Sequence, residues 1–272
     1  MLKIAMIAPI QVMGIANKFS EVEMTLFHLF KDREIPYAEA LQKRTRVNPV
    51  ILDNSFFELG KPASVEEMSA LLKKPYGNLI NKIILPDGDF SALDFLGDEL
   101  PCDLILVPTS VEELVAALKI VQLKYFTANP RPQMMIGISC IHAQKALKIE
   151  KFTQTTRDSF VEAGLKHFNA DFAEKIRRGN YLHFLGLNNQ PWAELFLLGA
   201  KYNASLDSSA FVWPFLKYKL DIRGIEDKFT EPVDFDTTWS FYTQGVLEEY
   251  LRSVVADLER NNIIAHFNKG GI

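Results

Sequence analysis

Three aspartates, Asp53, Asp87 and Asp207, each stand at or near the end of a short apolar run of the sequence. If these runs are parallel strands of a barrel, their carboxyl ends meet at one rim and the three carboxylates converge there. Such a cluster is costly unless it binds a cation, shares protons or meets a substrate that develops positive charge. A single aspartate at a strand end commonly caps the next turn or helix. Three together favour a reactive site over three separate caps.

Two kinds of chemistry use carboxylates arranged in this way. One is a divalent metal held by carboxylates and water, as in metal-dependent hydrolases and lyases. The other is cleavage of a glycosidic bond, in which two carboxyl groups flank an oxocarbenium-like centre. His142 and His183 could add to a metal site, but the sequence has no H-x-H or H-E-x-x-H pair. Because His183 begins its apolar run, we expect it to face the opposite end of the barrel and to be a structural residue. We also expect the protein to use no metal and no other cofactor.

The elements that must position these aspartates appear as two alternating patterns. Short apolar runs are continuous, which is typical of strands covered on both faces. Amphipathic segments lie between the runs, and two of them begin with the helix-capping pattern S-V-E-E. This alternation predicts a parallel sheet with right-handed crossovers. The seven runs are residues 3–9, 50–54, 82–87, 103–108, 134–139, 183–188 and 204–208, and the clearest helical segments are 64–73, 110–123, 156–168 and 245–258.

An eighth strand is expected at residues 35–38 or after Trp213, and eight strands favour a closed (β/α)8 TIM-type barrel over an open doubly wound sheet. No G-x-G-x-x-G follows the first run, so a dinucleotide-binding fold has no support. There is no Gly-, Ser- or Pro-rich linker and no repeat of individual residues. We therefore expect residues 1–272 to form a single α/β domain, with an irregular helical cap after Arg223.

The composition is that of an ordinary globular chain: 272 residues, 48% of them apolar, with 30 basic and 34 acidic residues and a net charge of −4. The overall charge excludes a strongly basic nucleic-acid-binding module but leaves local basic clusters open. No stretch approaches the roughly 18 apolar residues of a membrane span, so we expect no membrane partner. The two cysteines, Cys102 and Cys140, exclude a disulfide framework and fit a reducing, cytoplasmic location.

Five short segments resemble, in order, those of the tRNA-guanine transglycosylases and their DNA-acting relatives, which insert 7-deazaguanine bases into DNA. This resemblance implies that Asp207 is the nucleophile, or the charge that stabilises the anomeric centre of the sugar. It implies that Asp53 is the general acid/base and that Asp87 hydrogen-bonds the edge of the base. The segments are residues 50–58 (VILDNSFFE), 84–87 (ILPD), 106–110 (LVPTS), 183–187 (HFLGL) and 205–209 (SLDSS).

The chain also departs from this family pattern. Thr109 and Ser110 stand where the family has Gln-Gly, Phe56 and Phe57 lie where smaller residues are expected, and the zinc-binding cysteines of the tRNA-acting enzymes are missing. These departures favour excision of a modified base from DNA over base exchange, because a pocket not matched to an incoming base lets water complete the reaction. A role in phage defence is compatible with such an activity. The expected base-binding residues are Asp87, Phe56, Phe57, Thr109, Ser110 and Asn188.

Excision from duplex DNA requires base flipping and aromatic stacking, for which Trp192 and Trp213 are further candidates. Phosphate contacts are expected from Lys217, Lys219 and Arg223, which follow the Asp207 run and so lie on the side of the site. Two other basic clusters, residues 43–46 and 175–178, precede their strands. Three alternatives stay open: base exchange, a metal-dependent barrel hydrolase or lyase acting on a small molecule, and a barrel that only binds nucleic acid.

Overall fold

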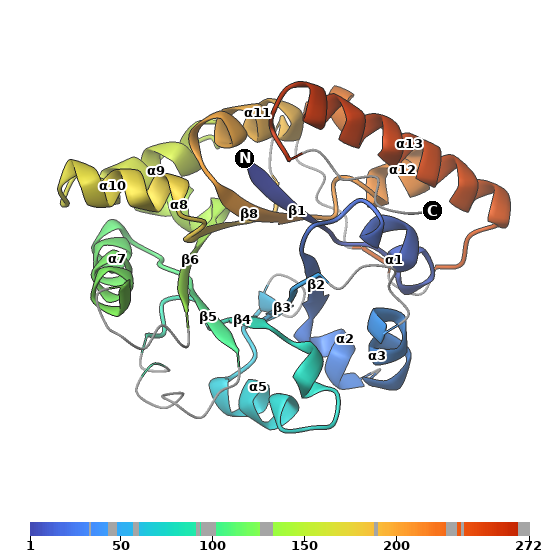
Figure 1. The fold of residues 1–272 in the computed structure, drawn as a ribbon, viewed down its shortest axis with the longest axis horizontal. Helices are drawn as coiled ribbons and strands as arrows, with labels where there is room; N and C mark the ends of the chain where they lie inside the picture. Colours follow the sequence, from blue (N-terminus) through green and yellow to red (C-terminus); the bar gives the residue numbers. More distant parts are fainter. Residues whose placement is uncertain are drawn as a thin grey trace.

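The computed structural model is a ring of eight parallel strands surrounded by helices (Figure 1). Neighbouring strands pair in the order β1-β8-β7-β6-β5-β4-β3-β2, which is the (β/α)8 barrel that the sequence predicted. The strands are β1 (Leu2–Met6), β2 (Glu23–Leu26), β3 (Val50–Asp53), β4 (Lys82–Ile84), β5 (Asp103–Leu106), β6 (Met134–Ser139), β7 (Leu182–Leu185) and β8 (Ala204–Ser208). The structure describes residues 1–32, 34–42, 48–56, 60–90, 93, 102–125, 133–187, 190–226, 233–234 and 237–265.

Helices between the strands cover the outside of the ring. The capping predicted at residue 64 is confirmed, since Ser64 Oγ accepts from the Glu67 N–H and the Glu67 carboxylate accepts from the Ser64 N–H. Among the described residues, no helix is both long and apolar enough to cross a membrane. The helices are α1 (Ile10–Asn17), α2 (Phe27–Asp32), α3 (Glu34–Gln42), α5 (Val65–Leu72), α7 (Val111–Tyr125), α8 (Cys140–Ala146), α9 (Thr156–Leu165), α10 (Ala170–Arg178), α11 (Pro191–Lys201), α12 (Trp213–Tyr218) and α13 (Phe241–Arg260), with 3-10 turns η1 (Gly77–Leu79) and η2 (Ile222–Gly224).

The position predicted for the eighth strand is wrong. The strand is β2, whereas residues 35–38 belong to α3 and the residues after Trp213 form α12. All four residues of β2 are buried, although Glu23 and Thr25 are polar. Met24 belongs to the apolar cluster inside the barrel, so the two polar side chains point to the opposite, helix-covered face. Without a continuous apolar run, β2 carries no strong strand signal.

The apolar core has two layers, one on each side of the strands. The inner layer fills the barrel and includes Ala5, Ile51 and Ile105, whereas the larger layer lies between the strands and the helices. Successive side chains of a strand point to opposite faces. Asp53 lies two residues after Ile51 in β3, and its side chain therefore points to the barrel interior at the carboxyl end of the strand.

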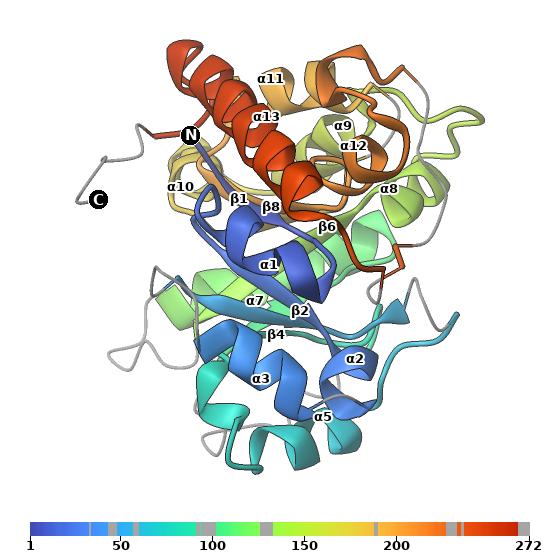
Figure 2. The same cartoon turned by 90° about the vertical axis from the view of Figure 1, so that its right-hand side faces the viewer.

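The barrel closes between β1 and β2, the two ends of the strand order. In the described chain no ladder joins these strands, but the Glu21 N–H donates to the Ile4 carbonyl at 3.0 Å. At the start of β1, the Leu2 N–H donates to the Ile263 carbonyl at 2.7 Å. This contact follows the end of α13, the long helix of the predicted cap, which contacts α1 on the outside of the barrel (Figure 2). The C-terminal segment thus covers the beginning of β1.

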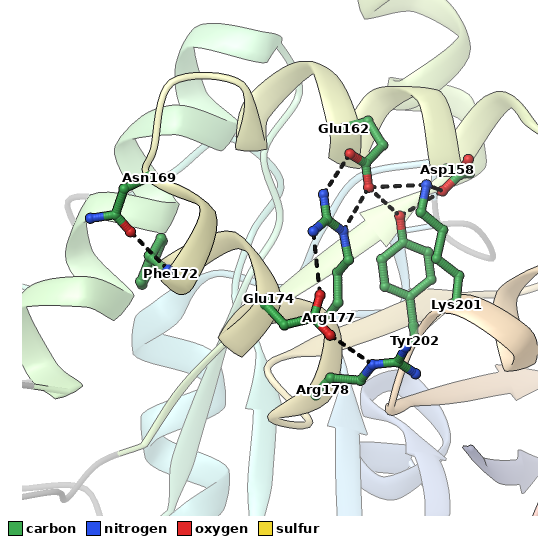
Figure 3. Close-up of polar contacts among 9 residues, drawn as sticks. All are labelled: Asp158, Glu162, Asn169, Phe172, Glu174, Arg177, Arg178, Lys201 and Tyr202. Carbon is green, nitrogen blue, oxygen red and sulfur yellow. Dashed lines mark hydrogen bonds and ion pairs between the residues drawn. The ribbon is translucent and has the colours of Figure 1, made fainter.

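A cluster of ion pairs joins α9, α10 and α11 (Figure 3). From α10, Arg177 donates through Nε and Nη2 to the two carboxylate oxygens of Glu162 at 3.0 and 2.8 Å. Lys201 Nζ lies 2.6 Å from Asp158 Oδ1 and 3.0 Å from Glu162 Oε1. The Tyr202 hydroxyl donates to Asp158 Oδ1 at 2.6 Å. These contacts fix the helices that carry the chain from β6 to β8.

This cluster predicts a loss of stability in acid. The hydrogen bond from Arg177 is the main reason that the pKa of Glu162 falls from 4.5 to about 2. A lowered carboxyl pKa stabilises the fold above about pH 4.5, and this stabilisation is lost as the pH falls toward 2. We expect Glu162→Gln to lower the free energy of unfolding at pH 7 by about 1 kcal/mol after screening by water, and by less at pH 3.

Denaturant unfolding at both pH values measures this difference. Glu174→Gln is the matched control, because the Glu174 side chain is 56% exposed and pairs with the same arginine. It should change the free energy of unfolding by less than about 0.5 kcal/mol. An effect of Glu162→Gln that is equal at pH 7 and pH 3 would contradict the expectation.

Candidate active site at the barrel mouth

A pocket of about 180 Å³ opens at the carboxyl ends of the strands. Asp53, Asp87 and Asp207 all line it, together with apolar side chains that include Ile7 and Met24. A cavity of about 150 Å³ is enough to accept a molecule the size of benzene, so this pocket has room for a small aromatic group. The three carboxylates that the sequence places at strand ends therefore meet in one pocket that can accept such a group.

Asp207 is held in the deepest polar part of this pocket. It lies in β8 and is 6% exposed. His183 Nε2 is 3.0 Å from Asp207 Oδ1, and the Gly186 N–H is 3.3 Å from each carboxylate oxygen. Gly186 has a φ of 66°, a left-handed conformation that favours glycine. These contacts fix the orientation of the Asp207 carboxylate.

The prediction that His183 faces the opposite end of the barrel, made from its place at the start of an apolar run, is wrong. His183 contacts Asp207 in the site. Its side chain is fully buried inside the barrel, and its Nδ1 lies 2.8 Å from Ser205 Oγ. Ser205 lies opposite His183 in the ladder and two residues before Asp207. Because alternate side chains share a face, the imidazole spans from Ser205 to Asp207 along the barrel interior. His183 is structural, and it supports the candidate catalytic carboxylate directly.

Asp87 and its neighbours form the opposite wall of the pocket. His142 Nε2 lies 2.6 Å from Asp87 Oδ2, and Asn54 Nδ2 lies 3.1 Å from Asp87 Oδ1. Phe56 also lines the pocket, and its ring centroid is 6.3 Å from that of His142. The ring of Phe56 and the three carboxylates thus line the same pocket. His142 therefore contacts a carboxylate of the site.

The other expected base-binding residues are placed differently. Thr109 and Ser110 lie directly before α7 and hydrogen-bond to its first turn. Both the N–H and the Oγ1 of Thr109 donate to Glu113 Oε2, and Ser110 Oγ accepts from the Glu113 N–H. Neither is among the described residues that line the pocket. Phe57 and Asn188 lie outside the described residues.

Two buried charged residues behind the pocket had no signal in the sequence. The side chains of Arg157 and Glu194 are both 0% exposed, and Arg157 Nε lies 2.9 Å from Glu194 Oε1. Arg157 Nη1 also donates to the carbonyls of Leu185 and Gly186 at 3.0 and 2.6 Å. Since the Gly186 N–H contacts Asp207, this arginine positions the segment that holds the candidate catalytic carboxylate.

The expected phosphate-binding residues lie on α12 and just after it. Lys217 and Lys219 are exposed, and each ammonium group lies over an aromatic ring, that of Lys217 5.6 Å from the ring centroid of Trp213. Arg223 is held by the carboxylates of Asp221 and Asp257. The two lysines thus lie at the surface, and Arg223 is paired with two carboxylates within the fold. The cluster at residues 43–46 lies outside the described residues.

The candidate stacking tryptophans differ in their exposure. Trp213 is 2% exposed and packs edge-on against Trp239, so its ring belongs to the core. Trp192 on α11 is half-buried, with its ring centroid 5.3 Å from that of Phe196. Phe56 is the one of these aromatics that lines the carboxylate pocket in the described chain.

Within the described part of the chain, no three His, Cys, Asp or Glu side chains are placed to share a metal ion. Comparison with protein-family models gives no match to this sequence, and comparison with curated proteins finds no similar protein. The function must therefore be argued from the chemistry of the pocket.

Proposed function

We propose that the protein is a DNA glycosylase that cleaves the N-glycosidic bond of a modified base and leaves an abasic site. The observation that carries the proposal is the convergence of Asp53, Asp87 and Asp207 on one pocket with room for a small aromatic group. Cleavage of this bond develops positive charge on the sugar and negative charge on the departing base. A site with several carboxylates and an aromatic wall suits both the sugar and the base.

Each carboxylate has a role consistent with its surroundings. Asp207, fixed by His183 and Gly186, faces the anomeric carbon and stabilises its positive charge. Asp53 donates the proton that the base takes as the bond between carbon and nitrogen breaks. Water then adds its hydroxide to the anomeric carbon and returns a proton to Asp53. Lys217 of α12 and Lys219 directly after it contribute positive charge for the DNA backbone.

A backbone feature next to Asp53 also supports the resemblance to nucleobase transglycosylases. Ser55 has a φ of 57°. Residues 53–58 resemble the D-[SN]-G-[GA]-[FY]-[EQ] segment of the transglycosylases, which has glycine at the position of Ser55. A left-handed conformation is uncommon for a residue with a side chain and is often found at functional sites. Here it is held by His28, whose N–H and Nδ1 lie 3.2 and 2.9 Å from Ser55 Oγ.

The test is incubation of the protein with a panel of phage DNAs that carry different base modifications, followed by mass spectrometry of the released bases. A glycosylase gives free base and an equal number of abasic sites, detected with an aldehyde-reactive probe. A labelled 7-deazaguanine added to the reaction distinguishes exchange, because exchange places the label in DNA and leaves no abasic site. Intact bases throughout the panel, with and without added divalent metal, would reject the proposal.

The hydrogen bond from His183 to Asp207 leads to a further prediction. His183→Ala removes a donor from a buried carboxylate, an interaction of about 1.5–3 kcal/mol. We expect the rate of base release to fall by about 10- to 100-fold, because each 1.36 kcal/mol of transition-state stabilisation that is lost lowers the rate tenfold. His183→Gln, whose amide can donate to the same oxygen, should recover part of the rate. If His183→Ala and His183→Gln release base at the same rate, measured at matched folded fractions, the hydrogen bond from His183 to Asp207 has no role in the reaction.

A further inference from the structure

The orientation of the Asn54 amide is fixed by the backbone. Its Nδ2 donates to the Leu85 carbonyl at 2.9 Å, and its Oδ1 accepts from the Phe56 N–H at 2.9 Å. A flipped amide would place donor against donor and acceptor against acceptor. The second contact of Nδ2, with Asp87 Oδ1 at 3.1 Å, is therefore a donation from Asn54. On this side Asp87 must accept.

The second oxygen of Asp87 is also an acceptor. His142 Nε2 lies 2.6 Å from Asp87 Oδ2, and the two side chains are only 10% and 12% exposed. A carboxylate has no donor of its own, so in this contact the Nε2–H of His142 donates and Asp87 Oδ2 accepts. The carboxylate of Asp87 thus receives one hydrogen bond at each oxygen, one from Asn54 directly after β3 and one from His142 in α8.

A carboxylate has about four lone-pair sites and, when ionised, no donor. Asn54 and His142 occupy one site at each oxygen of Asp87, and the remaining sites face the pocket that Asp87 lines. A ligand that presents only acceptor atoms to these sites would place its lone pairs against the carboxylate and displace the water that could donate to it. A ligand that presents one or two N–H groups would satisfy them.

We infer that His142 is a specificity-determining positioning residue, which keeps Asp87 as an acceptor-only group so that the pocket selects a base with N–H donors on the edge facing it. This inference rests on the proposed function, because it names the class of base that the same pocket takes. Amino and ring N–H groups of guanine-like or cytosine-like bases fit this requirement. His142 acts through Asp87 and does not itself contact the base.

The inference is tested by binding of 2′-deoxynucleosides, measured by titration calorimetry without DNA. Deoxyguanosine is compared with its 1,N2,N2-trimethyl derivative, and deoxycytidine with its N4,N4-dimethyl derivative, since neither methylated partner has an N–H donor on this edge. For the wild type, at least one natural nucleoside should bind about tenfold or more tightly than its methylated partner, as expected for a hydrogen bond to a charged group. Equal binding within each pair, or no binding at all, overturns the inference.

Variants separate positioning from a general effect on the fold. His142→Ala should lose most of the discrimination between a nucleoside and its methylated partner, whereas His142→Gln, which can still donate, should keep it. His167→Ala removes an exposed histidine at the end of α9 and should behave as the wild type. Asp87→Asn, which must turn its oxygen to Asn54, should lose the preference and gives a second test if His142→Ala does not fold. Full discrimination by Asp87→Asn, or by a folded His142→Ala, overturns the inference.

These binding data are independent of cleavage. Discrimination without release of any base from DNA would support the acceptor-only pocket and reject the glycosylase. Release of bases from DNA by a protein that shows no discrimination would support the glycosylase and reject the role of His142.

Discussion

Asp207→Asn is expected to reduce the rate of base release by about a thousandfold or more while the barrel remains folded. The substitution changes the charge and little else, because the asparagine oxygen can still accept from His183 and from the Gly186 N–H. A carboxylate beside a developing positive charge contributes most where water is excluded, and this side chain is only 8% exposed. A thousandfold loss corresponds to about 4 kcal/mol of transition-state stabilisation.

The matched control for this substitution is Asp171→Asn, which removes an exposed carboxylate from the first turn of α10. It should leave the rate unchanged within about twofold. Released base is quantified by mass spectrometry, and thermal unfolding is measured for both variants. An Asp207→Asn variant that is folded and retains a tenth or more of the wild-type rate would contradict the assignment of Asp207 as the main charge at the sugar.

The largest expected effect on stability comes from the buried pair behind the pocket. Arg157→Met leaves the carboxylate of Glu194 buried without its guanidinium partner, and both side chains are 0% exposed. Breaking a buried ion pair from one side typically costs about 3–5 kcal/mol, whereas replacing both charges with apolar residues is often neutral. We expect Arg157→Met to lower the free energy of unfolding by this amount, and Arg157→Met/Glu194→Met to recover most of it.

Activity should not recover in the double variant. Arg157 also donates to the carbonyls of Leu185 and Gly186, and no side chain of the double variant replaces these hydrogen bonds. The Gly186 segment is then less well fixed against Asp207, so base release should stay at least tenfold below the wild type. Denaturant unfolding and mass spectrometry provide the two measurements. A single variant that loses less than about 1 kcal/mol, or a double variant with full activity, would disprove this account.

The barrel was predictable from the sequence because seven of its strands are continuous apolar runs between helical patterns. Strand β2 was not, because its polar residues Glu23 and Thr25 are buried against the helical layer while Met24 faces the barrel interior. A burial pattern of this kind depends on which elements cover the strand. It is set by tertiary packing and cannot be read from the periodicity of four residues.

The candidate site likewise has features that the sequence predicted and features that it did not. The convergence of Asp53, Asp87 and Asp207 could be predicted, because a parallel barrel brings all its strand ends to one rim. The roles of His142 and Arg157 could not. His142 meets Asp87 across 55 positions of the sequence, and Arg157 meets Glu194 across 37. Such contacts depend on side-chain directions in loops and helices, for which a single sequence contains no spacing rule.

The way in which β1 is paired has a consequence for how the chain is made. The ladder partner of Leu2 is Ala204, and the N–H of Leu2 donates to Ile263. At a synthesis rate of 5–20 residues per second, roughly 10–40 s separate the emergence of β1 from that of β8. During this time the apolar strand LKIAM has exposed backbone edges, which are templates for aggregation. Strand β1 is thus synthesised long before its partners in β8 and at Ile263, and it is during this interval that protection by chaperones matters for this segment.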